Sequence, residues 1–349
     1  GWGSMCVVNK MLYTQEQRGD NEIVIAYDAT TGTELWRHND PVRFDEVVAG
    51  TGPRATPAYD AGRIYTYGSK ANVNCLDAAT GQVVWQRDLL KDYQLAIPMW
   101  AYSTSPVIAA GNVVLYMDLP KPEKIDTAKQ EAAKEGAAAE ETSKADAASL
   151  IALDAATGKT VWQLPITGQN YSSVEPITLS GETVLLFGTD TALLTIDPHD
   201  GKILNSEPIP APPGIPSMVQ PQLFGDGSLL VSLGDGQGLA RLEQTGNAAA
   251  PTWKQQWTSR KLKPSFNDFV VHDNHVYGFD QNIIACVDAQ TGEQKWKRGR
   301  YGFGQMLLFP ESSHLLVLSE AGELVLVAAD PAAHRELGKF PVIEGKTWN

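Results

Sequence analysis

The sequence is poor in the features that mark several large classes of protein. It contains no run near the roughly 18 apolar residues that a membrane-spanning helix requires. Basic residues are fewer than acidic ones, with 28 Lys and Arg and 41 Asp and Glu, which gives a formal net charge of −13. This balance argues against a nucleic-acid partner and against an anionic membrane surface, because both need a basic face. Outside one segment there is almost no 3.6-residue periodicity, which disfavours helical repeats.

Cysteine and histidine are scarce as well, which bears on disulfides and metals. The three cysteines are Cys6, Cys75 and Cys286, and the last two occupy equivalent small-residue positions in different repeats. A disulfide between them is therefore disfavoured, and a metal cluster more so. His272 and His275 flank a predicted turn, so we expect both rings to face solvent. The spacing of residues predicts no metal site.

What the sequence does contain is a repeated phrase, Asp-Ala-x-Thr-Gly-x-x-x-Trp, at 28–36, 77–85, 154–162 and 288–296. Each copy follows one short apolar run and leads into another, which predicts a strand, a turn and a second strand. The glycine supplies the positive φ that such a turn requires, and the indole fills the space to a neighbouring sheet. The residues with these predicted structural roles are Gly32, Gly81, Gly158, Gly292, Trp36, Trp85, Trp162 and Trp296.

Degenerate copies extend the phrase to seven units with a period of about 45 residues, and a second hairpin precedes each phrase. Four short strands in a unit of this length predict a β-propeller blade. We therefore expect an all-β fold in which residues 1–349 form one domain of four-stranded antiparallel blades. Seven units are complete, and an eighth begins at Lys346. Either the ring closes with seven blades and a tail, or residues beyond both ends complete an eighth blade. We expect the second, because a missing blade leaves open sheet edges.

The exception to the β pattern is the segment 121–148, which is inserted in the third unit. It holds nine Ala, seven acidic residues and five Lys. Such a composition favours helix or disorder and cannot bury a core by itself. We interpret the segment as a solvated excursion from a blade hairpin. A helix that docks a partner is the alternative.

A polar and aromatic stretch leads into the first strand of each unit. Loops from all the blades converge at one end of a propeller, which makes that rim the default place for a ligand. Arginine, amides and aromatic rings suit a polar ligand such as a sugar or an extended peptide. The alternative is that these side chains only satisfy exposed backbone groups and cap the blades. The candidate ligand-binding residues are Trp2, Arg54, Trp100, Tyr102, Tyr171, Gln220, Asn267, Gln305, Trp348 and Asn349.

The longer phrase Ala-x-Asp-Ala-x-Thr-Gly-x-x-x-Trp, at 26–36 and 152–162, resembles the tryptophan-docking repeat of pyrroloquinoline quinone (PQQ)-type bacterial propellers. These propellers typically have eight blades, and the resemblance covers the chain except for the insertion. The superfamily includes quinoprotein dehydrogenases and non-catalytic outer-membrane assembly lipoproteins of the BamB type. The BamB-like alternative implies a monomeric propeller, without a cofactor, that binds a protein, peptide or glycan at its loop-rich face. It also implies a place in the periplasm or cell envelope. The chain opens with Gly, so we take any signal peptide to be missing from it.

The second alternative that the resemblance implies is a dehydrogenase that uses PQQ and calcium to oxidise an alcohol or a sugar. Glu16, Asn267 and Asp268 are then the candidate calcium-site residues, with Asp268 as the base, and Arg54 contacts a quinone carboxylate. Two features depart from the enzyme pattern. The chain has no adjacent cysteines, and it is shorter than those enzymes. We therefore expect a binding protein rather than an enzyme.

Overall fold

The structure is a computed structural model that describes residues 3–47, 50–118, 147–167, 170–209, 218–246, 251–345 and 347. Trp2, Trp348 and Asn349 lie outside these residues. So does the predicted insertion 121–148, apart from its last two residues, which belong to a strand.

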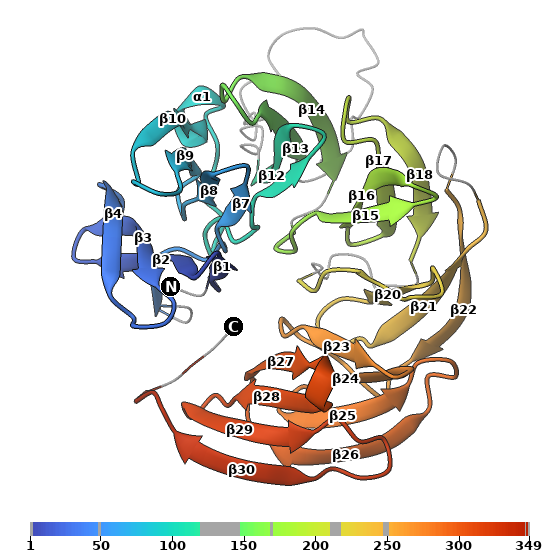
Figure 1. Cartoon of the computed structure of the whole chain (residues 1–349). Coiled ribbons are helices and arrows are strands. Elements are labelled where there is room, and N and C mark those ends of the chain that lie inside the picture. The colour runs from blue at the N-terminus through green and yellow to red at the C-terminus, as the bar shows by residue number, and fades with distance from the viewer. Residues whose placement is uncertain are drawn as a thin grey trace, which may run out of the picture.

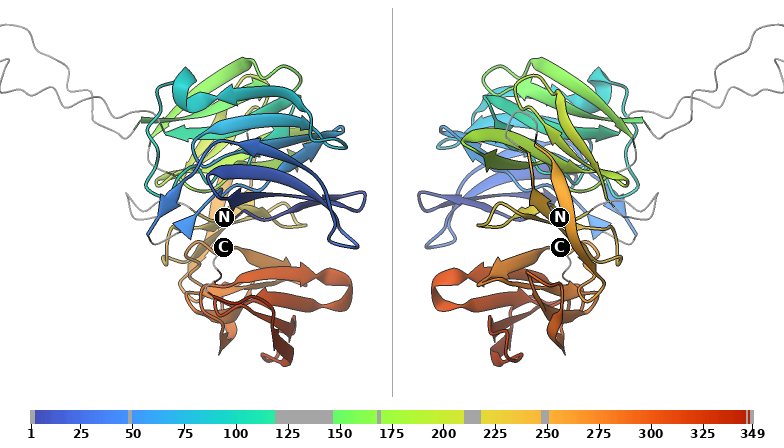
Figure 2. Two further views of the ribbon diagram at one scale, coloured as in Figure 1. Left: turned by 90° about the vertical axis from the view of Figure 1, so that its left-hand side faces the viewer. Right: turned by 90° about the vertical axis from the view of Figure 1, so that its right-hand side faces the viewer.

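Seven four-stranded antiparallel sheets surround a common centre (Figure 1). The four strands of each sheet are consecutive along the chain, so each blade is one continuous stretch of sequence. The predicted all-β propeller with seven complete four-stranded units is therefore confirmed. In the side views of Figure 2, the last sheet is set apart from the first. The eighth blade is not among the sheets of the described residues.

The first three blades alternate short innermost strands with longer central ones. Blade 1 contains β1 (Cys6–Val8), β2 (Met11–Arg18), β3 (Asn21–Asp28) and β4 (Glu34–Asp40). Blade 2 contains β7 (Ala58–Asp60), β8 (Arg63–Tyr67), β9 (Asn72–Asp77) and β10 (Val83–Asp88). Blade 3 contains β11 (Val107–Ala109), β12 (Asn112–Asp118), β13 (Ala147–Asp154) and β14 (Thr160–Thr167). The connections carry the small ribbon β5 (Asp45–Glu46) with β6 (Gly50–Thr51), and the short helix α1 (Leu89–Asp92).

The other four blades follow the same plan. Blade 4 contains β15 (Glu175–Leu179), β16 (Glu182–Gly188), β17 (Ala192–Ile196) and β18 (Ile203–Pro208). Blade 5 contains β19 (Gln222–Leu223), β20 (Leu229–Ser232), β21 (Leu239–Gln244) and β22 (Trp253–Ser259). Blade 6 contains β23 (Phe269–His272), β24 (His275–Asp280), β25 (Ile283–Asp288) and β26 (Gln294–Arg300). Blade 7 contains β27 (Gln305–Phe309), β28 (His314–Leu318), β29 (Glu323–Ala328) and β30 (Glu336–Pro341), with the 3₁₀ turn η2 (Pro310–Ser312).

The hydrophobic core is divided among the spaces between neighbouring blades. Between blades 1 and 2, for example, Tyr13 and Val24 pack against Ile64 and Leu76, and all four are buried. Five further clusters of this kind lie between the later neighbours in the ring. Because both faces of the central strands are covered, these strands are apolar along most of their length instead of alternating apolar and polar residues.

One contact recurs between blades and involves the phrase residues. The indole Nε1–H of Trp36 donates to the carbonyl oxygen of Ala78 in the next blade, at 3.0 Å. The ring lies over the turn, so a Cβ added to Gly81 would stand 2.5 Å from an indole carbon. Gly81 has a φ of +72°, a conformation that glycine adopts without strain. The glycine therefore serves both the turn and the close approach of the indole. The remaining phrase glycines have almost the same φ.

Candidate functional site at the inner rim

The cross-strand registers place one residue of each blade at an equivalent position beside the innermost strand. We call this set the inner ring: Ser4, Thr56, Ser105, Ser173, Gln220, Asp268 and Gln305. The innermost strands of several neighbouring blades contact each other directly, among them β11 with β15 and β23 with β27. The inner ring therefore lies where the blades converge.

In the first four blades the inner ring is a belt of hydroxyl groups that joins one blade to the next. The backbone N–H of Ser4 donates to Thr56 Oγ1 at 2.9 Å, and that of Thr56 donates to Ser105 Oγ at 2.9 Å. The N–H of Ser105 donates to Ser173 Oγ at 2.8 Å. The hydroxyls of Thr56, Ser105 and Ser173 are each used by the preceding blade, so these positions satisfy the backbone and leave little for a ligand.

In blades 5 and 6 the inner ring changes from hydroxyls to the amide of Gln220 and the carboxylate of Asp268. Gln220 Nε2 donates to Glu175 Oε2 at 3.1 Å and to the carbonyl oxygen of Val174 at 3.4 Å. Glu175 is the first residue of β15 and is half-buried, whereas Asp268 precedes β23 and is exposed. Gln220 thus holds one carboxylate in place and joins blades 4 and 5 at the rim.

The pKa values of both carboxyl groups are raised above their usual range. Burial, and secondarily the charge of Asp268, raise the pKa of Glu175 to about 7. The side chain of Asp268 is accessible to water, but the surrounding protein desolvates it and raises the pKa of Asp268 to about 6. Neither carboxylate forms an ion pair with the residues that the structure describes. Near neutral pH this part of the rim therefore carries negative charge without a matching cation.

Two of the predicted aromatic residues contact each other, Trp100 from the stretch before blade 3 and Tyr171 from the stretch before blade 4. The rings of Trp100 and Tyr171 lie with their centroids 5.2 Å apart at an angle of 48°. Both are half-buried, and Tyr171 stands two residues before Ser173 of the inner ring. A half-buried aromatic pair offers apolar surface to a ligand while it remains fixed in position.

Three other predicted ligand contacts are buried and donate hydrogen bonds to backbone carbonyl groups of the fold. Arg54 is 6% exposed, donates through Nη2 to the carbonyl oxygen of Gly50 at 2.9 Å, and stacks on Phe44. Tyr102 is 1% exposed, and its hydroxyl donates to backbone carbonyl groups. Asn267 is 1% exposed and donates to the carbonyl oxygen of Gly304 at 2.6 Å. These side chains hold loops in place, and we leave them out of the candidate site.

Glu16 lies in a different part of the molecule from Asn267 and Asp268. Its carboxylate pairs with Arg18 at 2.8 Å and accepts a hydrogen bond from the Tyr27 hydroxyl at 2.7 Å, all within blade 1. Asn267 and Asp268 belong to blade 6. The predicted calcium set is therefore not assembled, and the residues present do not fit a calcium-bound quinone. Among the described residues, no group of three or more His, Cys, Asp or Glu is placed to hold a metal.

The carboxylate that feels the charge of Asp268 is Glu175, which is not among the site residues predicted from the sequence. A signal was available, because Glu175 follows the inner-ring residue Ser173 by only two residues. Gln220 and Gln305 occupy their inner-ring positions on blades 5 and 7, and both are half-buried.

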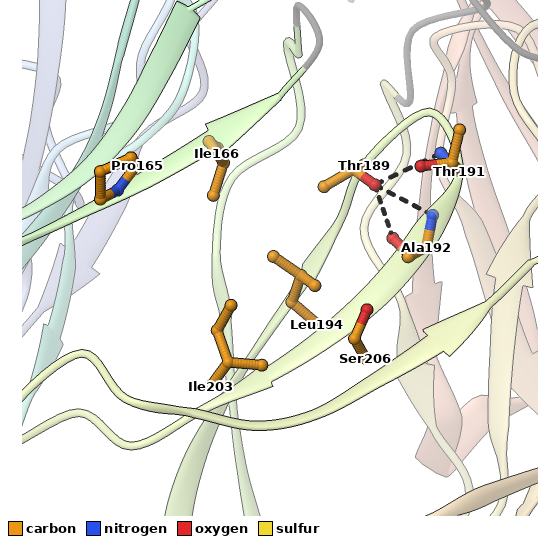
Figure 3. A pocket seen from close by; sticks show the side chains of 8 residues that line it. All are labelled: Pro165, Ile166, Thr189, Thr191, Ala192, Leu194, Ile203 and Ser206. Carbon is orange, nitrogen blue, oxygen red and sulfur yellow. Dashed lines mark hydrogen bonds between the residues drawn. The ribbon is translucent and has the colours of Figure 1, made fainter. Parts of the chain in front are cut away.

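A separate cavity of about 300 Å³ opens between blades 3 and 4 (Figure 3). The Thr189 hydroxyl on its wall is already used, because Thr189 Oγ1 donates to the carbonyl oxygen of Ala192 and accepts from its N–H. No ionisable side chain lines it, so it can accommodate an apolar group but has no acid–base chemistry. Its lining residues are Pro165, Ile166, Thr189, Thr191, Ala192, Leu194, Ile203 and Ser206.

Comparison with known families accounts for this architecture. The family model for the outer membrane protein assembly factor BamB matches residues 20–298, which is well over half of the chain. The chain belongs to the BamB family. No curated protein matches its sequence significantly. Among the described residues, no helix is both long and apolar enough to cross a bilayer.

Solved structures show the same fold at low sequence identity. BamB from Moraxella catarrhalis is 15% identical with a TM-score of 0.63, over 97% of this chain and 84% of that one. A quinohemoprotein alcohol dehydrogenase from Pseudomonas putida is 13% identical with a TM-score of 0.53, over 99% of this chain and 66% of that one. The computationally designed Ika8 protein is 8% identical with a TM-score of 0.58, over 98% and 87% of the two chains. At such identities the likeness concerns the fold alone.

Proposed function

We propose that this BamB-family propeller is a non-catalytic protein of the cell envelope that binds an extended, basic segment of a partner protein at its inner rim. The observation that carries the proposal is the change in the inner ring at blades 5 and 6. There Gln220 and Asp268 stand in place of the hydroxyls of the earlier blades, and Gln220 donates a hydrogen bond to Glu175. Neither Glu175 nor Asp268 forms an ion pair with the described residues. The envelope location rests on the family alone.

The chemistry of the rim favours a peptide over the other ligands considered. A Lys or Arg side chain brings the missing positive charge to Glu175 and Asp268, which lowers the free energy of ionising both. The Trp100–Tyr171 pair, which precedes blades 3 and 4, offers apolar surface to another residue of an extended segment. A glycan would use the aromatic pair but would leave the carboxylates without a cation.

The geometry gives less support to a quinoprotein dehydrogenase. Glu16 is committed to blade 1, and Arg54 donates to backbone carbonyl groups. Cys6, Cys75 and Cys286 are free thiols on separate blades. No step of an oxidation is therefore assigned to these residues.

The proposal is tested by titrating the protein with an acetylated hexapeptide of alternating Lys and Val, with a Glu–Val peptide as the reference. We expect saturable binding of the Lys peptide only. The double variant Glu175→Gln, Asp268→Asn should weaken it at least about tenfold, because two charge-assisted contacts are lost. Binding should strengthen between pH 5 and pH 8, as carboxyls with pKa values of about 7 and 6 ionise.

A matched control is Glu182→Gln, which removes the same charge from an exposed site at the opposite end of blade 4. Its affinity for the Lys peptide should equal that of the wild type. Equal affinity of the wild type and the double variant would show that the carboxylates are not the site. Binding of a cello-oligosaccharide that the double variant retains would favour a glycan ligand instead.

We also propose that the parent ring has eight blades, closed as a monomer. Support comes from the outward face of blade 7, where Leu307 is 63% exposed and Phe340 is 58% exposed. Leu316 and Leu326 align with Leu307 across the same face and are half-buried. A further sheet on this face would cover a large apolar surface and complete the ring.

A further inference from the structure

The stretch from the outer strand of blade 5 to the outer strand of blade 6 carries a local excess of positive charge. Residues 254–300 hold eight Lys and Arg against five Asp and Glu, whereas the whole chain holds 28 against 41. In physiological salt the field of an exposed charge is screened over about 8 Å, so nearby charges outweigh the net charge of the molecule. This stretch can therefore attract an anion although the protein as a whole is acidic.

Two lysines of this stretch share one buried carboxylate, that of Asp280 at the end of β24. The Asp280 side chain is 2% exposed. Lys297 of β26 donates a hydrogen bond to Asp280 Oδ2, and the Lys263 ammonium lies 2.7 Å from Oδ1 without the alignment of a hydrogen bond. The side chains of Lys263 and Lys297 are 22% and 31% exposed. Both lysines are therefore held in place by the fold while they remain partly accessible to a ligand.

Arg300 lies on the same face of the sheet as Asp280 and Lys297. Directly opposite residues of an antiparallel pair share a face, and Ile283 is opposite both Asp280 and Arg300. Lys297 is opposite Ala285, which is two residues further along β25 and so points to the same side. Arg300 is exposed, and its guanidinium forms no hydrogen bond or ion pair with the residues that the structure describes. It is free to contribute to a ligand site.

The connection from blade 5 packs along this face and brings Lys263 to it. A Cβ added to Gly278 of β24 would stand 3.3 Å from the side chain of Leu262. The backbone N–H of Gln281 donates to the carbonyl oxygen of Lys263 at 3.3 Å. The cationic side chains therefore lie together at the seam between blades 5 and 6. This is the end of blade 6 at which Asp268 of the inner ring also lies.

The charge and the donors of the cluster match a phosphate group. Lys263, Lys297 and Arg300 supply three positive charges and Asp280 supplies one negative charge, which leaves a formal charge of +2. A phosphate monoester carries about −1.5 to −2 at pH 7 and offers three strong acceptor oxygens. Each ammonium has three N–H donors and a guanidinium has five, far more than Asp280 can accept. A carboxylate ligand would bring a single charge and would neutralise only half of the excess.

We propose that Lys263, Lys297 and Arg300 form a binding site for a phosphate monoester at the seam between blades 5 and 6. The two ammonium groups, which Asp280 holds in place, and the guanidinium donate hydrogen bonds to the phosphate oxygens. The charge of the ligand balances the excess charge of the site. A soluble ester and a lipid headgroup present the same group to these residues. The site is separate from the acidic inner rim and goes beyond the peptide binding proposed there.

The test is calorimetric titration of the full chain with glycerol 3-phosphate, with glycerol as the reference. We expect saturable binding of the phosphate ester only. Arg300→Gln should weaken this binding at least about tenfold, because a charge-assisted contact is lost. The same variant should melt at the temperature of the wild type, since the Arg300 guanidinium has no partner among the described residues.

Arg298→Gln is the matched control for this variant. It removes the same charge from the same strand, but Arg298 is opposite Ile284 and therefore points to the other face of blade 6. Its affinity for glycerol 3-phosphate should equal that of the wild type. An equal loss in the two variants would mean that only the general charge of the molecule matters, and the site would be wrong.

Lys297→Gln tests the part of the site that is built on Asp280. It should also weaken the binding of glycerol 3-phosphate at least about tenfold. Its melting temperature is measured as well, because the variant leaves a buried carboxylate with one partner fewer. If Lys297→Gln does not fold, Arg300→Gln still decides the proposal.

Vesicle flotation separates the two sources of the phosphate group. The vesicles consist of phosphatidylcholine alone or of phosphatidylcholine with phosphatidic acid. Binding to the second kind only, lost in Arg300→Gln, would support the site and assign it to a lipid headgroup. Binding of glycerol 3-phosphate without binding to either vesicle would support it and assign it to a soluble ester. Binding of neither the ester nor the vesicles would overturn the proposal.

Discussion

Blades 1 to 4 and blades 4 to 6 use the same fold with different contacts. The first group repeats one arrangement, with an indole over the turns of blades 2, 3 and 4 and a hydroxyl belt at the inner ring. In the second group the indole contacts change, Gln220 and Asp268 stand at the inner-ring positions, and Gln220 donates to Glu175. The comparison teaches that the regular contacts hold the ring together, while the candidate site lies where the repeat departs from its pattern.

At the interface between blades 4 and 5, the indole comes from the later blade and not from the earlier one, as it does at the preceding interfaces. Asn205 stands at the tryptophan position of blade 4, and its buried Nδ2 has no hydrogen-bond partner. Trp253 of blade 5 reaches back instead and donates from Nε1 to Thr195 Oγ1 at 3.2 Å. It is 3% exposed. An indole therefore still fills this interface, but it comes from the outer strand of blade 5 and not from that of blade 4.

At the interface between blades 5 and 6 an indole again lies over the turn, but an arginine binds the carbonyl oxygen that accepts the indole hydrogen bond elsewhere. Trp257 lies over Gly292, as the other indoles lie over their glycines. However, Arg241 Nη1 donates to the carbonyl oxygen of Ala289 at 2.6 Å, and the buried Nε1 of Trp257 has no partner. Arg241 is 5% exposed and pairs with Asp226 at 2.5 Å. This contact relies on a buried cation and on packing rather than on an indole hydrogen bond.

The two regions should differ most in the free energy of unfolding that is lost when the residue at the tryptophan position of the repeated phrase is changed to alanine. Trp162→Ala leaves a cavity between blades 3 and 4 and should cost about 3–5 kcal/mol of unfolding free energy. Asn205→Ala at the equivalent position of blade 4 should cost less than about 1 kcal/mol, since its Nδ2 makes no hydrogen bond. Urea unfolding of both variants measures the contrast. Similar losses would mean that Trp162 is not the filler of its interface.

A smaller difference in unfolding free energy should separate the phenylalanine variants of two tryptophans, one with an indole hydrogen bond and one without. Trp85→Phe keeps most of the buried ring but loses the bond to the Ala155 carbonyl oxygen, which should cost about 1 kcal/mol more than Trp257→Phe. In Trp257→Phe no bond is lost, because the Nε1 of Trp257 is buried without a partner. Thermal or urea unfolding provides the comparison. A larger cost for Trp257→Phe would contradict the assignment of the acceptor to Arg241.

Much of the fold could be predicted from the sequence because the phrase fixes both the turn and the register. The sequence alone also reveals the recurrent pre-strand stretches that contain Ser4, Thr56, Ser173, Gln220 and Asp268. Trp257 was missed because extra residues after Gly246 break the nine-residue spacing. Nothing local marks this indole as equivalent to the others.

The site was less predictable because it depends on contacts between blades. Glu175 acquires its raised pKa from burial and from Asp268, two blades away. Arg54 had the chemistry of a ligand contact, but its burial and its backbone partners appear only in three dimensions. Residue type alone does not distinguish a rim side chain that binds a ligand from one that holds a loop.

The pH dependence of folding stability tests the central claim about Glu175 most directly. Its pKa of about 7 in the folded protein, against a usual value near 4.5, means that the folded state holds the proton more tightly than the unfolded chain. The wild type should therefore lose stability relative to Glu175→Gln as the pH rises from about 4.5 to about 7, by about 2 kcal/mol after allowance for partial exposure. A constant difference between the two proteins from pH 4 to pH 8 would contradict a desolvated, unmatched carboxylate at the rim.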